Sequence, residues 1–167
     1  MNWPYIHIVI NHFPIILTIV GSAVLALALI VRRRGLWLYA VATLTLAGAS
    51  VYPVYFAGDK AADAVRTTWY IIRSSVEEHD ASANYALVAG LLMGVVSAYA
   101  WWRMLRREVV GLPPVWLRVV VAIFAAFGLS VVVRTAYLGG QIVHESPKLQ
   151  NPPSNAAATV PSSGRQP

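Results

Sequence analysis

Four histidines, His7, His12, His79 and His144, are the residues of this sequence best suited to bind a metal. A neutral imidazole is a strong nitrogen donor that binds zinc, copper and the iron of haem. The chain has no cysteine, which excludes thiolate zinc sites, iron–sulphur clusters and covalently attached c-type haem. Its apolar stretches contain no Asp or Glu, which excludes a carboxylate-bridged di-iron site. The chemistry left is metal or haem binding through imidazole.

Four apolar stretches must position these histidines. The 167 residues are 57% hydrophobic and only 12% charged, about half the charge of a typical soluble domain. Each stretch can cross a hydrocarbon core of about 30 Å, and each must be helical because lipid offers no partner to backbone groups. The stretches are Phe13 to Val31, Leu36 to Ala57, Tyr85 to Trp102 and Val115 to Tyr137. The sequence therefore predicts an all-α, integral membrane four-helix bundle.

The basic residues predict an orientation in the membrane. Seven arginines and one acidic residue, Glu108, lie near the link between the first and second spans or near the link between the third and fourth. Six basic and six acidic residues lie on the opposite side. Basic loops stay in the cytoplasm, so we expect both termini, the 58–84 loop and all four histidines on the extracytoplasmic side. The charges do not form a basic face with interleaved aromatic residues, so no nucleic-acid partner is expected.

The loop and the tail on the outer side have their own patterns. Apolar residues at helical spacing after Gly58 and Asp59 predict an amphipathic helix lying on the outer interface. Ser75 followed by Glu78 is typical of a capping box, which predicts that the third helix begins near Val76. Residues 1–145 form the predicted transmembrane domain, and residues 146–167, with five prolines, form an extracytoplasmic tail that would contact another subunit.

The histidine spacing predicts how imidazoles from different helices would pair. His7 and His12 are five residues apart, about 140° around an ideal helix, and should face different neighbours unless Pro14 breaks the helix. In a regular helix two pairs are possible, His12 with His79 and His7 with His144, and the sequence does not choose the pairing. Such pairs, supplied by facing helices, are the ligands that b-type haem needs, and they would hold one or two haems.

Other residues suggest how a haem would be accommodated. The face of His79 continues through Ala83, Ala86 and Gly90, and these small residues either leave a slot for a flat macrocycle or allow close helix packing. Arg134, near the outer end of span 4, is the strongest candidate to pair with a haem propionate, and Arg66 and Arg73 are alternatives. A copper or zinc site, or no cofactor, remains open.

Several segments resemble a family of uncharacterised four-helix bacterial membrane proteins. The segments are His7–Pro14, Tyr52–Gly58, Glu77–His79 and Arg134–Glu145, and the resemblance covers about residues 5–145. It singles out His7, Asn11, His12, His79, Gly139, Gly140 and His144. Val143 stands where many relatives have Arg, which weakens any anion contact at that position. Related domains occur fused to Rieske or cytochrome c modules, so the resemblance implies electron transfer in the bacterial inner membrane.

These observations lead to one hypothesis and two alternatives. The protein is expected to hold b-type haem by bis-histidine ligation near the extracytoplasmic face, within a larger redox complex. It would pass electrons between a membrane donor, such as a quinol, and a cytochrome c or Rieske acceptor, without being an enzyme itself. The alternatives are a cofactor-free accessory subunit that anchors a membrane complex, and a copper or zinc site built from the histidines.

Overall fold

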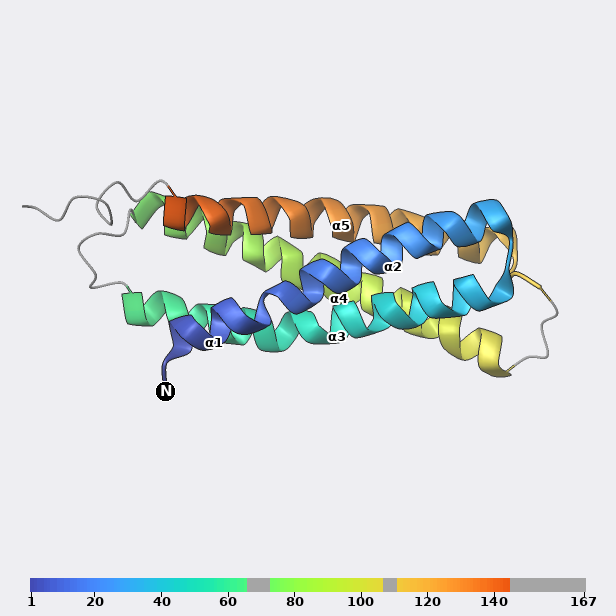
Figure 1. Ribbon diagram of the computed structural model, residues 1–167, viewed down its shortest axis with the longest axis horizontal. Coiled ribbons are helices and arrows are strands. Elements are labelled where there is room, and N and C mark those ends of the chain that lie inside the picture. The colour runs from blue at the N-terminus through green and yellow to red at the C-terminus, as the bar shows by residue number, and fades with distance from the viewer. Residues whose placement is uncertain (66–72, 107–110, 145–167) are drawn as a thin grey trace, which may run out of the picture.

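The computed structural model describes residues 1–65, 73–106 and 111–144, and every regular element in them is a helix. The helices are α1 (Trp3–Ile10), α2 (His12–Val31), α3 (Arg34–Val65), α4 (Arg73–Arg106) and α5 (Val115–His144). The first two form a single interrupted rod, so four rods lie side by side (Figure 1). All four are long and apolar enough to cross a membrane, which confirms the predicted membrane four-helix bundle.

The first rod is broken at Asn11, and Pro14 explains the break. A proline has no N–H, and its ring crowds the carbonyl four residues earlier, here that of Ile10, the last residue of α1. The Asn11 N–H still donates to the carbonyl of His7 at 2.9 Å, so the chain continues in the same direction into α2. His7 and His12 therefore belong to two helices of one rod, with Asn11 between them.

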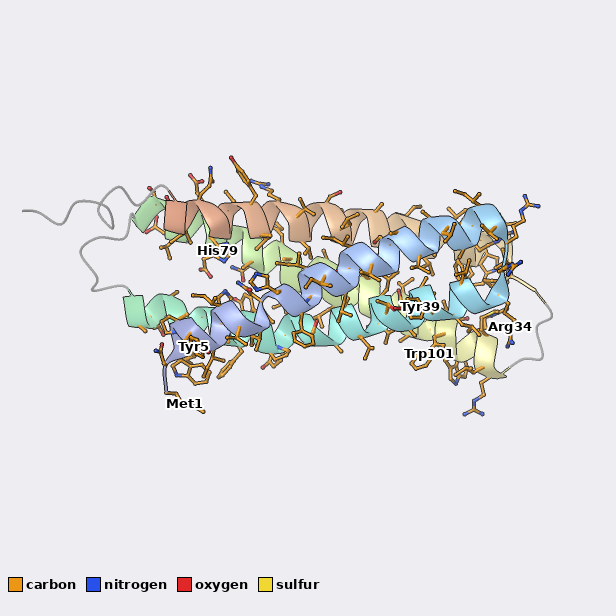
Figure 2. The ribbon with its side chains drawn as sticks, in the orientation of Figure 1. Met1, Tyr5, Arg34, Tyr39, His79 and Trp101 are labelled. Carbon is orange, nitrogen blue, oxygen red and sulfur yellow. The ribbon has the colours of Figure 1, made fainter. Side chains whose placement is uncertain are left out.

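The two ends of the bundle differ in charge. Six arginines of the described chain lie at the end of the bundle that carries the 31–34 turn, where Figure 2 labels Arg34. They are Arg32, Arg33, Arg34, Arg103, Arg106 and Arg118. Every Asp and Glu that the structure describes lies toward the other end: Asp59, Asp63, Glu77, Glu78 and Asp80. The charge asymmetry read from the sequence is thus an asymmetry between the two ends of the folded bundle.

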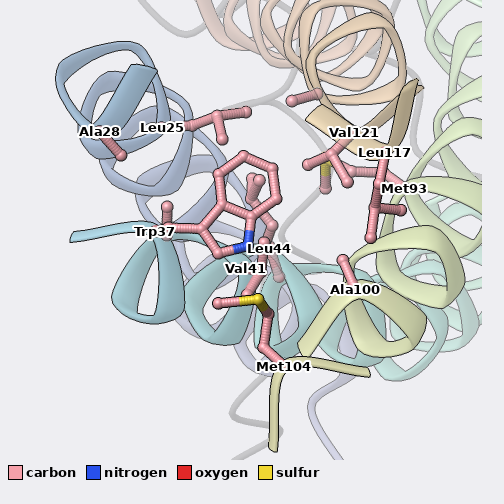
Figure 3. Close-up of a cluster of buried hydrophobic side chains, with 13 residues drawn as sticks. Leu25, Ala28, Trp37, Val41, Leu44, Met93, Ala100, Met104, Leu117 and Val121 are labelled. Carbon is pink, nitrogen blue, oxygen red and sulfur yellow. The ribbon is translucent and has the colours of Figure 1, made fainter. Parts of the chain in front are cut away.

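The apolar core is concentrated in the half of the bundle near the arginines. In cross-section α2 and α4 each pack against both α3 and α5, and α1 packs mainly against α3. Fully buried side chains from the first turns of α3 and α5 meet the last turns of α4, with Trp37, Met104 and Leu117 at the centre (Figure 3). Of the buried polar side chains in the described residues, Ser82 lies toward the other end of the bundle, Thr18 lies near the middle of the first rod, and Thr43 and Ser97 lie in the arginine half.

Glycines let α3 and α4 touch backbone to backbone. A Cβ built on Gly48 would lie 2.5 Å from Gly94 Cα and 2.7 Å from the Gly90 carbonyl oxygen. A Cβ on Gly90 would lie 2.6 Å from Val51 Cγ2. The small residues that continue the face of His79 were expected either to leave a slot for a macrocycle or to allow close helix packing. At Gly90 they allow close helix packing, and no slot for a macrocycle exists there.

Gly48→Ala is expected to destabilise the bundle by about 1–3 kcal/mol or more, because the added methyl group meets backbone atoms that cannot rotate away. The measurement is the temperature at which half of the purified protein loses its monodisperse chromatographic peak. Gly35→Ala is the matched control, because a Cβ there has no neighbour within 4 Å among the described residues. Equal thermal stability of the two variants would show that α3 and α4 are not packed as described.

The helix ends at the acidic end of the bundle differ from those expected from the sequence. Helix α3 runs through Gly58 to Val65, so a separate interfacial helix does not begin at Gly58 and Asp59. Gly58 stays helical and no proline follows it in α3, so nothing stops the helix, whose 32 residues span about 48 Å and exceed the hydrocarbon core. Helix α4 begins at Arg73 rather than near Val76, and residues 66–72 and the 146–167 tail lie outside the described residues.

Candidate functional site

His7 and His79 face each other across the bundle. Their ring centroids are 6.5 Å apart and their planes cross at 74°. His7 belongs to α1 and His79 to α4, two helices that do not form one of the main packed pairs. In Figure 2 His79 projects from α4 toward the side of the bundle formed by α1 and α3. The sequence left the pairing of the histidines open, and the structure brings His79 next to His7, whereas His12 is exposed.

The His7 ring lies against α3 in a seat made by a carbonyl and a glycine. Its Nδ1 is 3.2 Å from the carbonyl oxygen of Val54. A carbonyl oxygen only accepts, so Nδ1 carries the proton and donates, and the neutral ring keeps its lone pair on Nε2. A Cβ built on Gly58 would lie 2.9 Å from Cε1 of the ring, 3.2 Å from Nδ1 and 3.6 Å from Nε2. Only glycine allows the ring to lie so close to the helix.

The His79 ring has the same kind of seat on α5. Its Nδ1 donates to the carbonyl of Thr135 at 3.1 Å. A Cβ built on Gly139 would lie 3.0 Å from Cε1, 3.3 Å from Nδ1 and 3.7 Å from Nε2, each within 0.1 Å of the value at the other seat. In both seats the glycine follows the carbonyl residue by four positions, so carbonyl and glycine lie one above the other on the helix. Two helices thus hold two imidazoles in matching ways.

Hydroxyl groups join α4 to α5 beside the His79 seat. The Ser82 and Thr135 hydroxyl oxygens are 2.7 Å apart, and Thr135 Oγ1 also lies 2.9 Å from the Val131 carbonyl and 3.2 Å from the Ser82 carbonyl. Ser82 is buried, with 5% of its surface exposed. The helix that carries His79 and the helix that accepts its hydrogen bond are therefore held in register at the level of the imidazole.

Polar atoms without partners lie on the α2 side of the interior. Asn11 Oδ1, Thr18 Oγ1 and Ser22 Oγ are buried and have no hydrogen-bond partner in the part of the chain that the structure describes. Asn11 is one turn after His7, and Thr18 is fully buried. A buried polar atom without a partner costs roughly 1–3 kcal/mol. Polar groups of a bound ligand, or ordered water, are the contacts expected for such atoms.

The other residues singled out by the sequence lie away from this pair. His12 is exposed, and its Nδ1 lies 3.1 Å from the carbonyl of Ile8, in the preceding helix of its own rod. A Cβ on Gly140 has no described neighbour within 4 Å, so this glycine forms no seat. His144 is the last residue of α5, and its side chain lies outside the described part.

Among the candidate propionate cations, Arg134 is the residue whose side chain the structure describes. Arg134 is exposed and lines a surface pocket between α4 and α5. Arg73 is the first residue of α4, and its side chain lies outside the described part, as does the whole of Arg66.

A site with three or more protein ligands is not present among the described residues. No group of three His, Cys, Asp or Glu side chains there is placed to hold a metal ion. The described chain therefore offers two imidazoles that face each other, rather than the cluster of three or four histidines that the copper or zinc alternative requires.

Of the residues that hold the rings, the sequence singled out Gly139, through the resemblance, but not Gly58, Val54 or Thr135. Val54 and Thr135 act through backbone carbonyls, which any residue type provides, so their side chains give no signal. The signal that exists is a glycine inside an otherwise regular helix, as at Gly58 and Gly139, where the lower helix propensity of glycine requires a packing reason.

Comparisons of the chain with family models, with curated proteins and with solved structures found no match. The resemblance to a bacterial membrane family stays a prediction, and the proposals below depend on the geometry of the described residues.

Proposed function

We propose that this protein is a membrane electron-transfer subunit that binds one b-type haem between His7 and His79. The observation that carries the proposal is the matched histidine pair, with each Nδ1 bonded to a backbone carbonyl of the adjacent helix. Metal-bound histidines almost always donate their other N–H to a carbonyl or carboxylate, which fixes the tautomer and the ring orientation. Both rings already have this second hydrogen bond.

The separation of the rings suits two imidazoles that would hold one iron between them. The ring centroids are 6.5 Å apart, close to the sum of about 6.2 Å from two metal–nitrogen bonds of about 2.0 Å and two distances of about 1.1 Å from nitrogen to ring centre. A tetrahedral zinc would bring the centroids to about 5 Å. His7 and His79 would therefore supply the two nitrogen ligands of a haem iron.

The surroundings of the pair also suit a haem. The rings come from helices that are not a main packed pair, so a flat ligand between them would not displace a helix–helix contact. Asn11 and Thr18 offer buried polar atoms on the same side of the interior. When bound, the haem iron supplies a one-electron redox couple, and the protein supplies the two imidazoles, their orientation and an interior of low dielectric.

We infer that the histidine pair lies near the extracytoplasmic face of a bacterial inner membrane, with both termini outside. The arginine-rich end is supported as the cytoplasmic end by the positive-inside rule. A haem near the outer face would accept electrons from a lipid-soluble donor such as a quinol and deliver them to a cytochrome c or Rieske partner. The 146–167 tail is the segment proposed to contact other subunits.

Single-cysteine labelling tests this orientation without background, because the chain contains no cysteine. In spheroplasts, Ala64→Cys is expected to react with a membrane-impermeant maleimide, whereas Gly35→Cys is expected to react only after the membrane is permeabilised. Both positions are exposed, and they lie near opposite ends of α3. The reverse labelling pattern would place the histidine pair near the cytoplasm and contradict the proposed acceptor.

An absorption spectrum of the protein purified from haem-replete cells tests the proposed function. We expect a Soret band, a reduced α band and about one haem per chain. A folded, helical protein without these bands, and without bound metal, would favour the cofactor-free accessory subunit. About one zinc or copper per chain, with no extractable porphyrin, would favour the inorganic metal site.

A further inference from the structure

A pocket on the surface of the bundle, separate from the histidine pair, carries two opposite charges that do not meet. It has a volume of about 320 Å³ and is lined by Glu78, Ala81, Ser82 and Tyr85 of α4 and by Arg134 of α5. Neither Glu78 nor Arg134 belongs to an ion pair in the part of the chain that the structure describes. A small pocket with an unpaired cation and an unpaired anion is complementary to a ligand that carries both charges.

The pocket lies toward the acidic end of the bundle, near the ends of two helices that are long enough to cross a membrane. Glu78 is four residues, about 6 Å, from the outer end of the span that begins at Ser74, and Arg134 is eight residues, about 12 Å, from the end of the span at Ile142. The long side chain of an arginine at this distance from the helix end can reach the phosphate layer of a membrane, where an anion compensates its charge. A neutral ligand such as a quinone would accept hydrogen bonds from Arg134 but would not neutralise it.

Apolar side chains continue from the pocket toward the middle of the membrane. On α4, Val88, Leu92 and Val95 follow Tyr85 along the same face and are 58%, 46% and 66% exposed. On α5, Phe127 and Ile123 extend from Arg134 in the same direction and are 54% and 60% exposed. This arrangement has the order of a phospholipid, with a polar headgroup region at the outer interface and apolar contacts beneath it for acyl chains.

We propose that this pocket binds the headgroup of a zwitterionic phospholipid with a primary amine, of the phosphatidylethanolamine class. Arg134 donates to the phosphate, and Glu78 accepts hydrogen bonds from the ammonium group. A choline headgroup has the same charges but no N–H, so it satisfies Arg134 and leaves Glu78 without a hydrogen bond. The site therefore selects headgroups by the number of N–H groups on the amine.

Lipid retention by the purified protein tests the proposal without reference to haem. The probes are dioleoyl-phosphatidylethanolamine, its N-monomethyl and N,N-dimethyl forms, and dioleoyl-phosphatidylcholine, each doped into detergent micelles and detected by mass spectrometry of intact complexes. Wild-type protein is expected to retain them in decreasing order as methyl groups replace N–H, with about a tenfold difference between the first and the last. Equal retention across the series would overturn the proposal.

Two variants identify the side chains involved. Arg134→Gln is expected to reduce retention of all four lipids about tenfold, and Glu78→Gln to abolish the discrimination among them. Glu77→Gln and Arg33→Gln are the matched controls, because both residues are exposed and neither lines the pocket. The proposal would be overturned if Arg134→Gln retained as much phosphatidylethanolamine as the wild type. It would also be overturned if a short-chain quinone, rather than the phospholipid, were retained at this arginine.

Discussion

His7→Ala and His79→Ala are each expected to lower the affinity for haem by more than about 100-fold, so that the purified variants lack the Soret and reduced α bands. Loss of the group that hydrogen-bonds a metal ligand already lowers the affinity for the metal about 10- to 100-fold, and loss of the ligand itself lowers it more. Either substitution leaves the opposite ring with its carbonyl bond but with no second ligand across the gap. Both variants should therefore lose haem binding to a similar extent.

His12→Ala is the control that distinguishes this site from the other pairing considered for His79. His12 is exposed and its Nδ1 is bonded within its own rod, so its removal should leave the haem content and both absorption bands unchanged. Circular dichroism and gel filtration establish that each variant is folded. Loss of haem in His12→Ala, with haem retained in His7→Ala, would show that the His7–His79 pair is not the haem site.

Gly58→Ala and Gly139→Ala are expected to weaken haem binding by similar amounts, about 10- to 100-fold, through displacement of the imidazoles rather than their removal. The new methyl groups would lie 2.9 Å from His7 Cε1 and 3.0 Å from His79 Cε1, whereas ordinary contacts begin at 3.4 Å. Each ring must therefore move by about 0.4–0.5 Å, away from the carbonyl that accepts its Nδ1 hydrogen. Titration of the apoprotein with haem measures the loss.

Gly140→Ala is a closely matched control, because the neighbouring glycine lies in the same helix and has open space around it. A glycine-to-alanine change in a helix gains about 0.5–1 kcal/mol of stability at either position, so the difference between Gly139→Ala and Gly140→Ala isolates the contact with His79. Equal haem affinity in these two variants would mean that the ring does not lie against Gly139 when haem is bound. The Gly35→Ala variant provides the corresponding control for Gly58.

The helical membrane fold follows from local properties of the sequence. A stretch that lacks charge and is long enough to span lipid must form a helix, whatever its neighbours, because no other conformation satisfies its backbone in lipid. The four rods and the separation of Arg32–Arg34 from Asp59 and Asp63 are therefore readable from composition and order alone. Helix ends were less predictable: α3 and α5 continue beyond Ala57 and Tyr137, since nothing local stops them.

The sequence indicated histidines, small residues and arginines, but only the tertiary structure decided which of them meet. Side-chain partners across a bundle depend on the rotation of each helix about its axis, which brings His7 next to His79 and leaves His12 exposed. The same holds for the role of each glycine, since Gly90 packs against Val51 whereas Gly58 and Gly139, the latter already singled out by the resemblance, lie against imidazoles. Lipid requires a helix but does not fix its rotation. That rotation is set by contacts between residues far apart in the chain, such as His7 with Val54 and His79 with Thr135.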